Sequence, residues 1–498
     1  MITEDKIQSM TISDLLSSDT LDCLYDMEDR LEQTRIKALL QVRAKELGIF
    51  RAYSTMLKSF DSEQERVSRQ YQKTKDIPDF FHGKQFLHNV MGDYLIKKYG
   101  VCKINGALHI YDNGVYRQGE DILHGYMIEL APTIKDIQRK EVYKYMKSSL
   151  KTPVKQPAPP YLIPFKTKIY NVETDEFLEY SPEHVFLNRF PYDYKPDAEP
   201  CESVLDTVRN IADHDEEVVN LLFESMGNCF YLRNTYRGVV ILYGNGKNGK
   251  STLLNMIIQL LGEENVSSLS LRDTGEKFRV SQLYGKAANM GDDIPDNYFP
   301  DSSAFKALVT GGKITVENKG KDPFDLQSYA KMFFAANALP PVKDKSDGFY
   351  SRILVVPLKR DFTKLEIYNP HLKDHRWTEK EMEYLTRLAV DGLKRILKNN
   401  DFTRPKTVVE AIEEYELENN PLKQFIIEFK EEHSGSLAPF VVADIYREYQ
   451  IWCGSNGHKN TYSRTKFSQE VKKAENVDIR PKQINGKLQR CFFNLDSL

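Results

Sequence analysis

Cysteine is scarce in this sequence. Six of the 498 residues are cysteine, and no two of them form a CxxC pair. The scarcity excludes a dense disulfide framework, and the missing pairs argue against a zinc ribbon. The sequence therefore predicts reduced, mostly buried thiols. They are Cys23, Cys102, Cys201, Cys229, Cys453 and Cys491.

Long apolar runs are also missing. No segment approaches the roughly 18 consecutive apolar residues of a membrane helix. The N-terminus, MITEDKIQSMTISDLL, has no basic segment followed by a long apolar one, as a secretory signal would have. We therefore expect a cytoplasmic protein with no membrane partner. No internal repeat or low-complexity tract is evident in the sequence.

The sequence has little net charge of either sign. Lys and Arg number 69 and Asp and Glu number 72, which gives a formal net charge of −3. Any surface that binds nucleic acid must therefore come from a local concentration of cations. With 41% hydrophobic residues the chain can bury a substantial core, and its length suggests a multi-domain protein.

A phosphate-binding loop is the strongest motif present. Gly244, Gly249, Lys250 and Ser251 satisfy GxxxxGK[ST], a β-rich apolar run precedes them, and an amphipathic helix follows. Glycines let backbone N–H groups turn toward phosphates, and the helix N-terminus adds its positive dipole end. Lys250 would then contact the β- and γ-phosphates of ATP, and Ser251 the Mg²⁺. The candidate nucleotide-binding residues are Gly244, Asn245, Gly246, Lys247, Asn248, Gly249, Lys250, Ser251 and Thr252.

The same loop also fits a second pattern. Gly244, Gly246 and Gly249 match the GxGxxG fingerprint of dinucleotide-binding loops. Dinucleotide-binding loops of this type do not direct a lysine at the phosphates, so Lys250 favours the ATP-binding interpretation.

Two acids follow the next weakly apolar segment. KAANMGDDIPD ends its short apolar run in Asp292 and Asp293, about 40 residues after the loop, which leaves room for a helix and a core strand. A P-loop ATPase needs one carboxylate on Mg²⁺ and another to polarise the attacking water. Asp292 and Ser251 are the candidate metal ligands. Both acids are candidate catalytic residues, and either could be the base.

Two more polar residues adjoin apolar strands. The run 332–336 predicts a buried strand that delivers Asn337 to its end, where an amide could orient water against the γ-phosphate. Arg352 precedes the apolar run ILVVPL, and an arginine there could reach phosphates bound by a neighbouring subunit. The alternatives are an asparagine that begins a turn and an ordinary surface arginine.

These motifs together resemble one family. YGNGKNGKST, ANMGDDIPD, FKALVTGGKITVENKGKDPF, MFFAANALP and GFYSRILVVPL are similar, in this order, to superfamily 3 helicases of the phage, plasmid and poxvirus-type primase-helicase branch. The resemblance implies an α/β, AAA+-like P-loop ATPase core. It also implies ATP hydrolysis with Mg²⁺ during 3′-to-5′ movement along single-stranded DNA.

The resemblance implies roles for individual residues. Asp292 and Asp293 would be the Walker B pair, although many family members end this element in Asp-Glu. Asn337 would be the sensor asparagine. Arg352 would be the arginine finger that acts across a subunit interface, which implies a ring, most simply a homo-hexamer.

A hairpin of this family projects into the central channel of the ring, and KITVENKGKDPF resembles it. The resemblance places Lys319 and Lys321 against the phosphates of the threaded strand, a contact that suits cations. Without the resemblance, the two lysines would be taken for a solvated β-turn.

The domain organisation follows from composition and from the same resemblance. The connector at about 151–164 is rich in proline, which disfavours helix. The expected domains are a helical N-terminal module at 1–78, an α+β accessory domain at 79–195, the superfamily 3 ATPase domain at 196–400, and a helical linker with a winged-helix DNA-binding domain at 401–498.

The C-terminal region predicts a helix, a second helix and a final strand, an order that fits a winged helix. Its excess of basic residues favours contact with DNA phosphates, and a solvated basic face or a protein-docking module is the alternative. Tyr446, Tyr449 and Trp452 share a helix face, which predicts core packing. The candidate DNA-binding residues are Arg464, Lys466, Lys472 and Lys473, with further cations at Arg480, Lys482, Lys487 and Arg490.

Carboxylates for a primase site are not evident. The best candidates, Asp213 and Asp215, precede an apolar-periodic helix and suit its N-terminal turn. We therefore expect helix capping at this position.

Together these features predict an ATP-dependent replicative DNA helicase of a phage, plasmid or mobile element. It would act on single-stranded and forked DNA in the host cytoplasm, with a separate primase or polymerase as partner. Two alternatives remain open. One is a DNA-binding ATPase scaffold or initiator that does not unwind, and the other is a fused primase-helicase with an unrecognised primase site.

Overall fold

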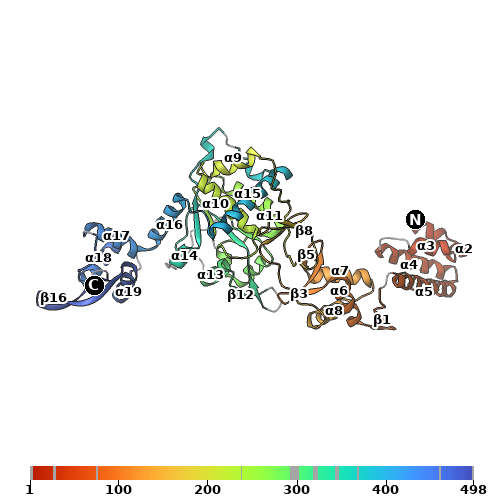
Figure 1. The fold of residues 1–498 in the computed structure, drawn as a ribbon. Coiled ribbons are helices and arrows are strands. Elements are labelled where there is room, and N and C mark those ends of the chain that lie inside the picture. Colours follow the sequence, from red (N-terminus) through yellow and green to blue (C-terminus); the bar gives the residue numbers. More distant parts are fainter. Residues whose placement is uncertain are drawn as a thin grey trace. The chain divides into compact units, whose positions relative to one another are not determined.

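The computed structural model divides the chain into two compact units, Met1–Ile110 with Gln118–Val154, and Tyr111–Arg117 with Lys155–Leu498. Figure 1 draws the whole chain as a ribbon. The structure describes residues 4–25, 30–74, 77–236, 238–291, 302–317, 323–342, 347–366, 369–433, 435–458 and 461–495.

The first unit begins with helices, as the spacing of its apolar residues predicts. Leu15, Leu40 and Tyr53 come from three different helices and are fully buried in one cluster, so these helices are held together by tertiary packing. The helices are α1 (Glu4–Ser9), α2 (Ile12–Leu15), α3 (Ser18–Tyr25), α4 (Arg30–Glu46) and α5 (Phe50–Thr74).

A small α+β region follows, with its own core around Met91, Leu95, Met127 and Val142. A tight turn joins two neighbouring strands of this region, with positive φ at Asn113 (46°) and Gly114 (94°). The elements are β1 (Phe81–His82), β2 (Gln85–Phe86), α6 (His88–Tyr99), β3 (Cys102–Ile104), β4 (Ala107–Asp112), β5 (Val115–Gln118), α7 (Glu120–Leu130) and α8 (Asp136–Ser148).

The second unit is built on a parallel sheet of five strands in the order β10-β11-β14-β9-β15. Its strands are nearly continuous runs of buried residues, as expected of a parallel sheet covered on both faces. A P-loop NTPase-like core of mixed α/β structure is therefore present. The strands are β9 (Val239–Tyr243), β10 (Val266–Ser267), β11 (Ala288–Gly291), β14 (Lys331–Ala336) and β15 (Ile353–Pro357).

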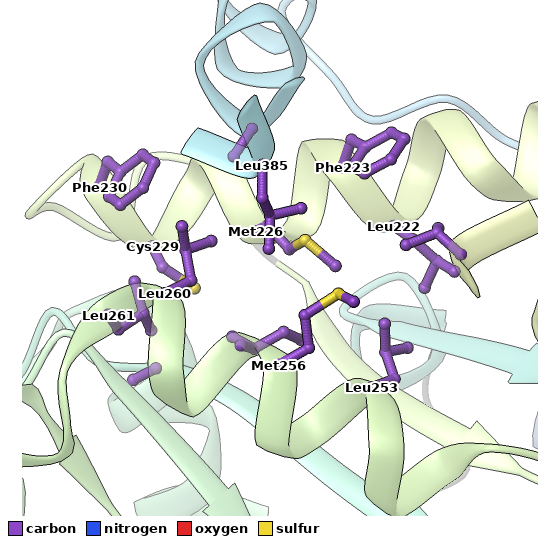
Figure 2. Close-up of a cluster of buried hydrophobic side chains, with 14 of the residues drawn as sticks. Leu222, Phe223, Met226, Cys229, Phe230, Leu253, Met256, Leu260, Leu261 and Leu385 are labelled. Atoms are coloured by element: carbon purple, nitrogen blue, oxygen red, sulfur yellow. The ribbon is translucent and has the colours of Figure 1, made fainter. Parts of the chain in front are cut away.

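Three helices cover the side of this sheet that carries the largest core cluster (Figure 1). They are α10 (Glu216–Phe230), α11 (Lys250–Leu261) and α15 (Glu379–Asn399). Figure 2 shows Met226 and Leu222 of α10 facing Met256 and Leu253 of α11, whereas Phe223 lies on the side of α10 that faces away from α11. The helix that begins at Lys250 is thus packed along its length against a buried layer.

Two glycines allow α10 and α15 to approach closely. A Cβ on Gly227 would lie 2.0 Å from the carbonyl oxygen of Ala389, and a Cβ on Gly392 would lie 2.6 Å from the backbone of Phe223. Each helix therefore needs glycine where it meets the backbone of the other.

The remaining elements of the core are shorter. They are β6 (Leu162–Pro164), β7 (Ile169–Asn171), β8 (Glu176–Leu178), α9 (Glu202–Ile211), α12 (Lys277–Val280), α13 (Ser302–Thr310), β12 (Lys313–Val316), β13 (Phe324–Gln327) and α14 (Asp347–Tyr350).

The C-terminal region contains helices and one long antiparallel hairpin. Tyr449 is buried, and Tyr446 and Trp452 pack against the same cluster, which confirms the prediction of core packing. Val441 also forms an isolated antiparallel bridge with Cys491 of the hairpin. The elements are α16 (Lys406–Asn419), α17 (Pro421–Glu432), α18 (Val442–Ser455), α19 (Arg464–Glu475), β16 (Val477–Ile484) and β17 (Lys487–Asn494).

Among the helices of the described ranges, none is both long and apolar enough to cross a lipid bilayer.

Candidate nucleotide site and the opposite edge of the sheet

The phosphate-binding loop joins β9 to α11 at the carboxyl edge of the sheet. Its backbone takes positive φ at Gly246 (94°), Lys247 (55°) and Gly249 (84°). Glycine adopts this conformation at little cost, whereas Lys247 adopts it under constraint from the loop. Both contextual predictions are confirmed, because a strand precedes the loop and a helix begins at Lys250.

Gly244 lies where no side chain would fit. A Cβ there would be 1.9 Å from Nδ2 of Asn248 and 2.4 Å from the carbonyl oxygen of Leu358. The buried Asn248 side chain donates to that Leu358 oxygen at 2.8 Å. The base of the loop is thereby joined to the chain that follows β15.

Lys250 is mostly buried and reaches across the mouth of the loop. Its Nζ donates to the carbonyl oxygen of Gly244 at 2.5 Å, to Oδ1 of Asn248 at 3.1 Å and to Oδ1 of Asn337 at 3.0 Å. The structure thus brings together the lysine of the loop and the asparagine at the end of β14, two residues that are 87 positions apart.

A cavity of about 620 Å³ opens in front of the loop. Gly246 through Thr252 and Asn337 border it, whereas Gly244 and Asn245 do not. Gly244 contributes instead by leaving room for Asn248. The cavity is large enough for a nucleotide-sized ligand.

The other walls of the cavity were not found from the sequence. They come from α9 and from the segment after β15, which are far apart in the chain and carry no local motif. Ile211, Phe362, Pro370 and Leu372 give that side an apolar surface suited to a planar ring. The polar residues of these walls are Asp206, Thr207, Asn210, Asn369 and Lys373.

The candidate Walker B residues, Asp292 and Asp293, lie outside the described residues. Strand β11 ends just before them at Gly291, which pairs with Phe334 of β14. The buried Asn289 fixes β11 to the preceding segment, since it accepts from the backbone N–H of Leu269 at 2.7 Å and donates back at 2.9 Å.

Arg352 lies at the other edge of the sheet. Its carbonyl oxygen accepts from the N–H of Val239, the first residue of β9, at 2.8 Å. Five residues of β9 at about 3.3 Å each place this edge roughly 16 Å from the phosphate loop. Arg352 therefore does not border the cavity of its own chain. Its Nε is buried and finds no hydrogen-bond partner in the described part of the protein.

Two paired strands lie where the pore hairpin is expected. Strands β12 and β13 pair antiparallel, with Val316 opposite Phe324. Lys319 and Lys321 lie between them, outside the described residues.

The cations predicted to contact DNA in the C-terminal region are exposed. Lys466 lies over the ring of Tyr462, with its Nζ 4.9 Å from the ring centroid, and Lys472 pairs with Asp478 at 2.8 Å. These predicted cations are Arg464, Lys466, Lys472, Lys473, Arg480, Lys482, Lys487 and Arg490.

Asp215 caps α10, as predicted. Its Oδ1 accepts from the N–H groups of Glu217 at 3.0 Å and Val218 at 3.3 Å. Asp213 does not share that role, because its carboxylate lies 3.9 Å from Nε of Arg360.

Three family models match successive parts of the chain. One described as D5 N terminal like matches residues 53–211, a family of unknown function (DUF5906) matches 242–352, and one described as Poxvirus D5 protein-like matches 417–493. The two D5-type matches, together with the relatives below, support a D5-type primase-helicase family for this chain. The resemblance found in the sequence is thereby confirmed. The phosphate loop and Arg352 fall within the middle match.

Relatives of this chain in large DNA viruses carry the name "putative helicase". L207/L206 of Acanthamoeba polyphaga mimivirus is 22% identical over 59% of this chain and 33% of its own length. Protein 121R of Invertebrate iridescent virus 3 is 23% identical over 66% of this chain and 39% of its own length. The chain thus spans well under half of the length of the curated relatives that it matches.

A solved structure shares the fold. The A form of the NrS-1 C-terminal region, without ligand, aligns with a TM-score of 0.50 and 13% identity over 81% of this chain and 98% of that one.

Proposed function

We propose that the chain is an ATP-dependent DNA helicase of the superfamily 3 type, with an AAA+-like core that works as a ring, most simply a homo-hexamer. The observation that carries this proposal is the placement of Lys250 and Asn337 together at one edge of the sheet and of Arg352 at the other. A ring brings these two edges into one site, because each subunit presents its amino edge to the loop of the next.

The residues of the loop suit ATP with Mg²⁺. The hydroxyl of Ser251 borders the cavity and makes no hydrogen bond to any described residue, so it is free to act as an oxygen ligand. Ser251 and Asp292 would hold the ion, and when bound it would neutralise charge on the phosphate oxygens. Lys250 would contact the β- and γ-phosphates, as in other P-loop proteins.

Asn337 would orient the attacking water. Its amide oxygen already faces Nζ of Lys250 at 3.0 Å, so the amide lies where the γ-phosphate would arrive. Asp292 or Asp293 would accept the proton of the water. Arg352 of the neighbouring subunit would stabilise the charge that develops on the transferred phosphoryl group.

DNA would be held at two places. Lys319 and Lys321 at the tip of the β12-β13 hairpin would contact the threaded strand in the channel, and the C-terminal cations would contact duplex phosphates. The order of elements in the C-terminal region supports a winged helix. Helix α17 is followed by the bridged residue Val441, then by helices α18 and α19, and finally by the β16-β17 hairpin. Family resemblance gives 3′-to-5′ movement and a separate primase or polymerase as partner.

Strand displacement tests this proposal. Wild type, Lys250→Ala and Arg352→Ala would be compared on a 3′-tailed fork, with a 5′-tailed fork and the exposed Lys364→Ala variant as controls. We expect ATP-dependent displacement of the 3′-tailed fork by wild type and Lys364→Ala only. ATP hydrolysis by wild type without displacement of either fork would instead favour a DNA-bound ATPase scaffold.

A further inference from the structure

A second polar cavity, of about 250 Å³, lies at the amino edge of the sheet. Its walls come from the approach to β9 (Thr235 and Tyr236), the approach to β15 (Ser351 and Arg352) and the turn after α15, residues 400–404. The turn after α15 has no role in the proposed function.

The charged groups of this cavity are two guanidinium groups and one carboxylate. Arg352 contributes one guanidinium, and its buried Nε is without a partner among the described residues. Arg404 contributes the other, and it pairs with Asp401 at 3.3 Å. The two arginines outnumber the single acid, so the cavity favours an anion, and phosphate oxygens match the fork of donors that arginine presents.

The turn that presents Arg404 is held by a buried acid. Glu224 of α10 is fully buried, and its carboxylate accepts from the backbone N–H and from the hydroxyl of Thr403, each at 2.7 Å. Arg395 donates to the same carboxylate at 3.2 Å. A buried carboxylate is stable only with such partners, so the residue next to Arg404 is fixed to the core.

The aromatic side chain beside it fixes the turn further. Phe402 is buried, and it packs against the site of Gly238, just before β9. Asn400 ends α15 in the left-handed conformation with φ of 57°. Arg404 is therefore carried by rigid backbone, as a side chain that must meet a ligand at a set position needs to be.

We propose that Arg404 is a second phosphate-binding residue, which acts with Arg352 on the nucleotide held by a neighbouring copy of the chain. This inference rests on the proposed function, because only a neighbouring loop brings a nucleotide to the amino edge. Arg352 would meet the transferred phosphoryl group, and Arg404 would hold the phosphate oxygens beside it. The site of hydrolysis would then be incomplete without two arginines from the partner copy.

Hydrolysis by mixed chains tests the inference. We expect Arg404→Ala to lower kcat for ATP at least about tenfold, Arg404→Lys to recover part of that loss, and Lys406→Ala to match wild type. Lys406 follows two residues later and is a suitable control, since its side chain is 87% exposed. Adding Lys250→Ala chains, which keep Arg404, should raise the turnover of each Arg404→Ala chain. The inference is overturned by an Arg404→Ala kcat equal to that of Lys406→Ala, or by no rise on mixing.

Pyrophosphate binding separates this inference from the proposed function. In a Lys250→Ala background, calorimetry with inorganic pyrophosphate should show binding that Arg404→Ala weakens at least about tenfold and Lys406→Ala leaves unchanged. If the wild type never hydrolyses ATP but pyrophosphate binding still depends on Arg404, the phosphate-binding role of Arg404 stands and the proposed helicase activity is rejected. If the wild type hydrolyses ATP but Arg404→Ala leaves pyrophosphate binding unchanged, only the phosphate-binding role of Arg404 is rejected.

DNA is the other source of phosphate. Affinity for single-stranded DNA should be equal in Arg404→Ala and Lys406→Ala. Weaker DNA binding by Arg404→Ala with unchanged ATP hydrolysis would assign the cavity to the DNA backbone and overturn the inference.

Discussion

The two edges of the parallel sheet differ in how their polar groups are used. At the carboxyl edge, Lys250 bonds to Gly244, Asn248 and Asn337, and Asn248 also joins the loop to the chain after β15. At the amino edge, Arg352 keeps a buried Nε that meets no acceptor among the described residues. The lysine of the carboxyl edge is bonded within its own chain, whereas the arginine of the amino edge keeps one donor without an acceptor among the described residues.

This difference leaves the amino edge able to take an acceptor from outside the chain. A buried donor without an acceptor costs about 1 to 3 kcal/mol, so an acceptor brought to Nε of Arg352 would stabilise this edge. The nucleotide of a neighbouring subunit would supply the acceptor. The two edges would then be halves of one site.

The largest effect is expected from removing the lysine of the carboxyl edge. Lys250→Ala should lower kcat for ATP by about a thousandfold or more, because the main cation on the phosphates is lost. Steady-state phosphate release measures the loss, and an unchanged melting temperature shows that the fold is retained. If Lys250→Ala hydrolyses ATP at a rate within tenfold of wild type, the carboxyl edge is not the phosphate site and the contrast between the two edges does not hold.

The helix layer that supports both edges gives the next largest effect. Gly227→Ala should lower the free energy of unfolding by about 3 kcal/mol, because its new methyl would lie 2.0 Å from a backbone oxygen of α15. Gly125→Ala in α7 is the matched control, since a Cβ there meets nothing within 4 Å. It should raise stability by about 0.5 kcal/mol through helix propensity. Equal effects of the two changes in urea unfolding would show that close packing of α10 and α15 is not needed.

Asn337→Ala sharpens the assignment of the carboxyl edge. We expect kcat for ATP to fall about a hundredfold with little change in KM, because the amide acts on the attacking water rather than on bound ATP. Initial rates over a range of ATP concentrations measure both constants. A higher KM with the same kcat would make Asn337 a binding residue instead.

A buried lysine at the amino edge gives the smallest effect. Lys331 begins β14, and its Nζ donates to oxygens of Tyr231, Arg233, Asn234 and Tyr329. Burial nevertheless lowers the pKa of Lys331 from its ordinary 10.5 to about 7. Between these values the unfolded chain holds a proton that the folded chain lacks. The contribution of Lys331 to the free energy of unfolding therefore increases as pH rises from about 7 toward 10.5. This contribution is lost as pH falls back through about 7.

Lys331→Met should remove that dependence on pH. Between pH 7.5 and 9.5, wild type should gain about 2 kcal/mol more unfolding free energy than the variant, from the difference of one proton. Urea unfolding at the two pH values measures the gain. If the unfolding free energy of wild type and of Lys331→Met changes equally with pH, the four oxygens keep the ammonium charged. The lysines of both edges would then be charged and fully hydrogen-bonded.

The sequence predicted those parts of the site that follow a local pattern. The strand before the loop, the strand that delivers Asn337 and the position of Arg352 before β15 all follow from apolar runs and their flanks. Asp215 capped α10 for the same reason. Each of these features depends on a few neighbouring residues.

Contacts between distant segments could not be predicted. Ile211 and Phe362 come to the cavity from segments about 150 residues apart, and neither stands in a motif. Arg404 and Arg352 border the same cavity, and the hydrogen bond from Thr403 to Glu224 of α10 holds the turn that carries Arg404. Such pairs depend on how the helices pack over the sheet, which periodicity does not reveal.

The most direct test of the claim that two edges form one site is to mix two inactive chains. Arg352→Ala retains the carboxyl edge, and Lys250→Ala retains the amino edge. We predict that each variant alone hydrolyses ATP at a rate near background, and that an equimolar mixture recovers a measurable fraction of the wild-type rate. A mixture no more active than its two components would contradict the account, because Arg352 would then not complete a site on another chain.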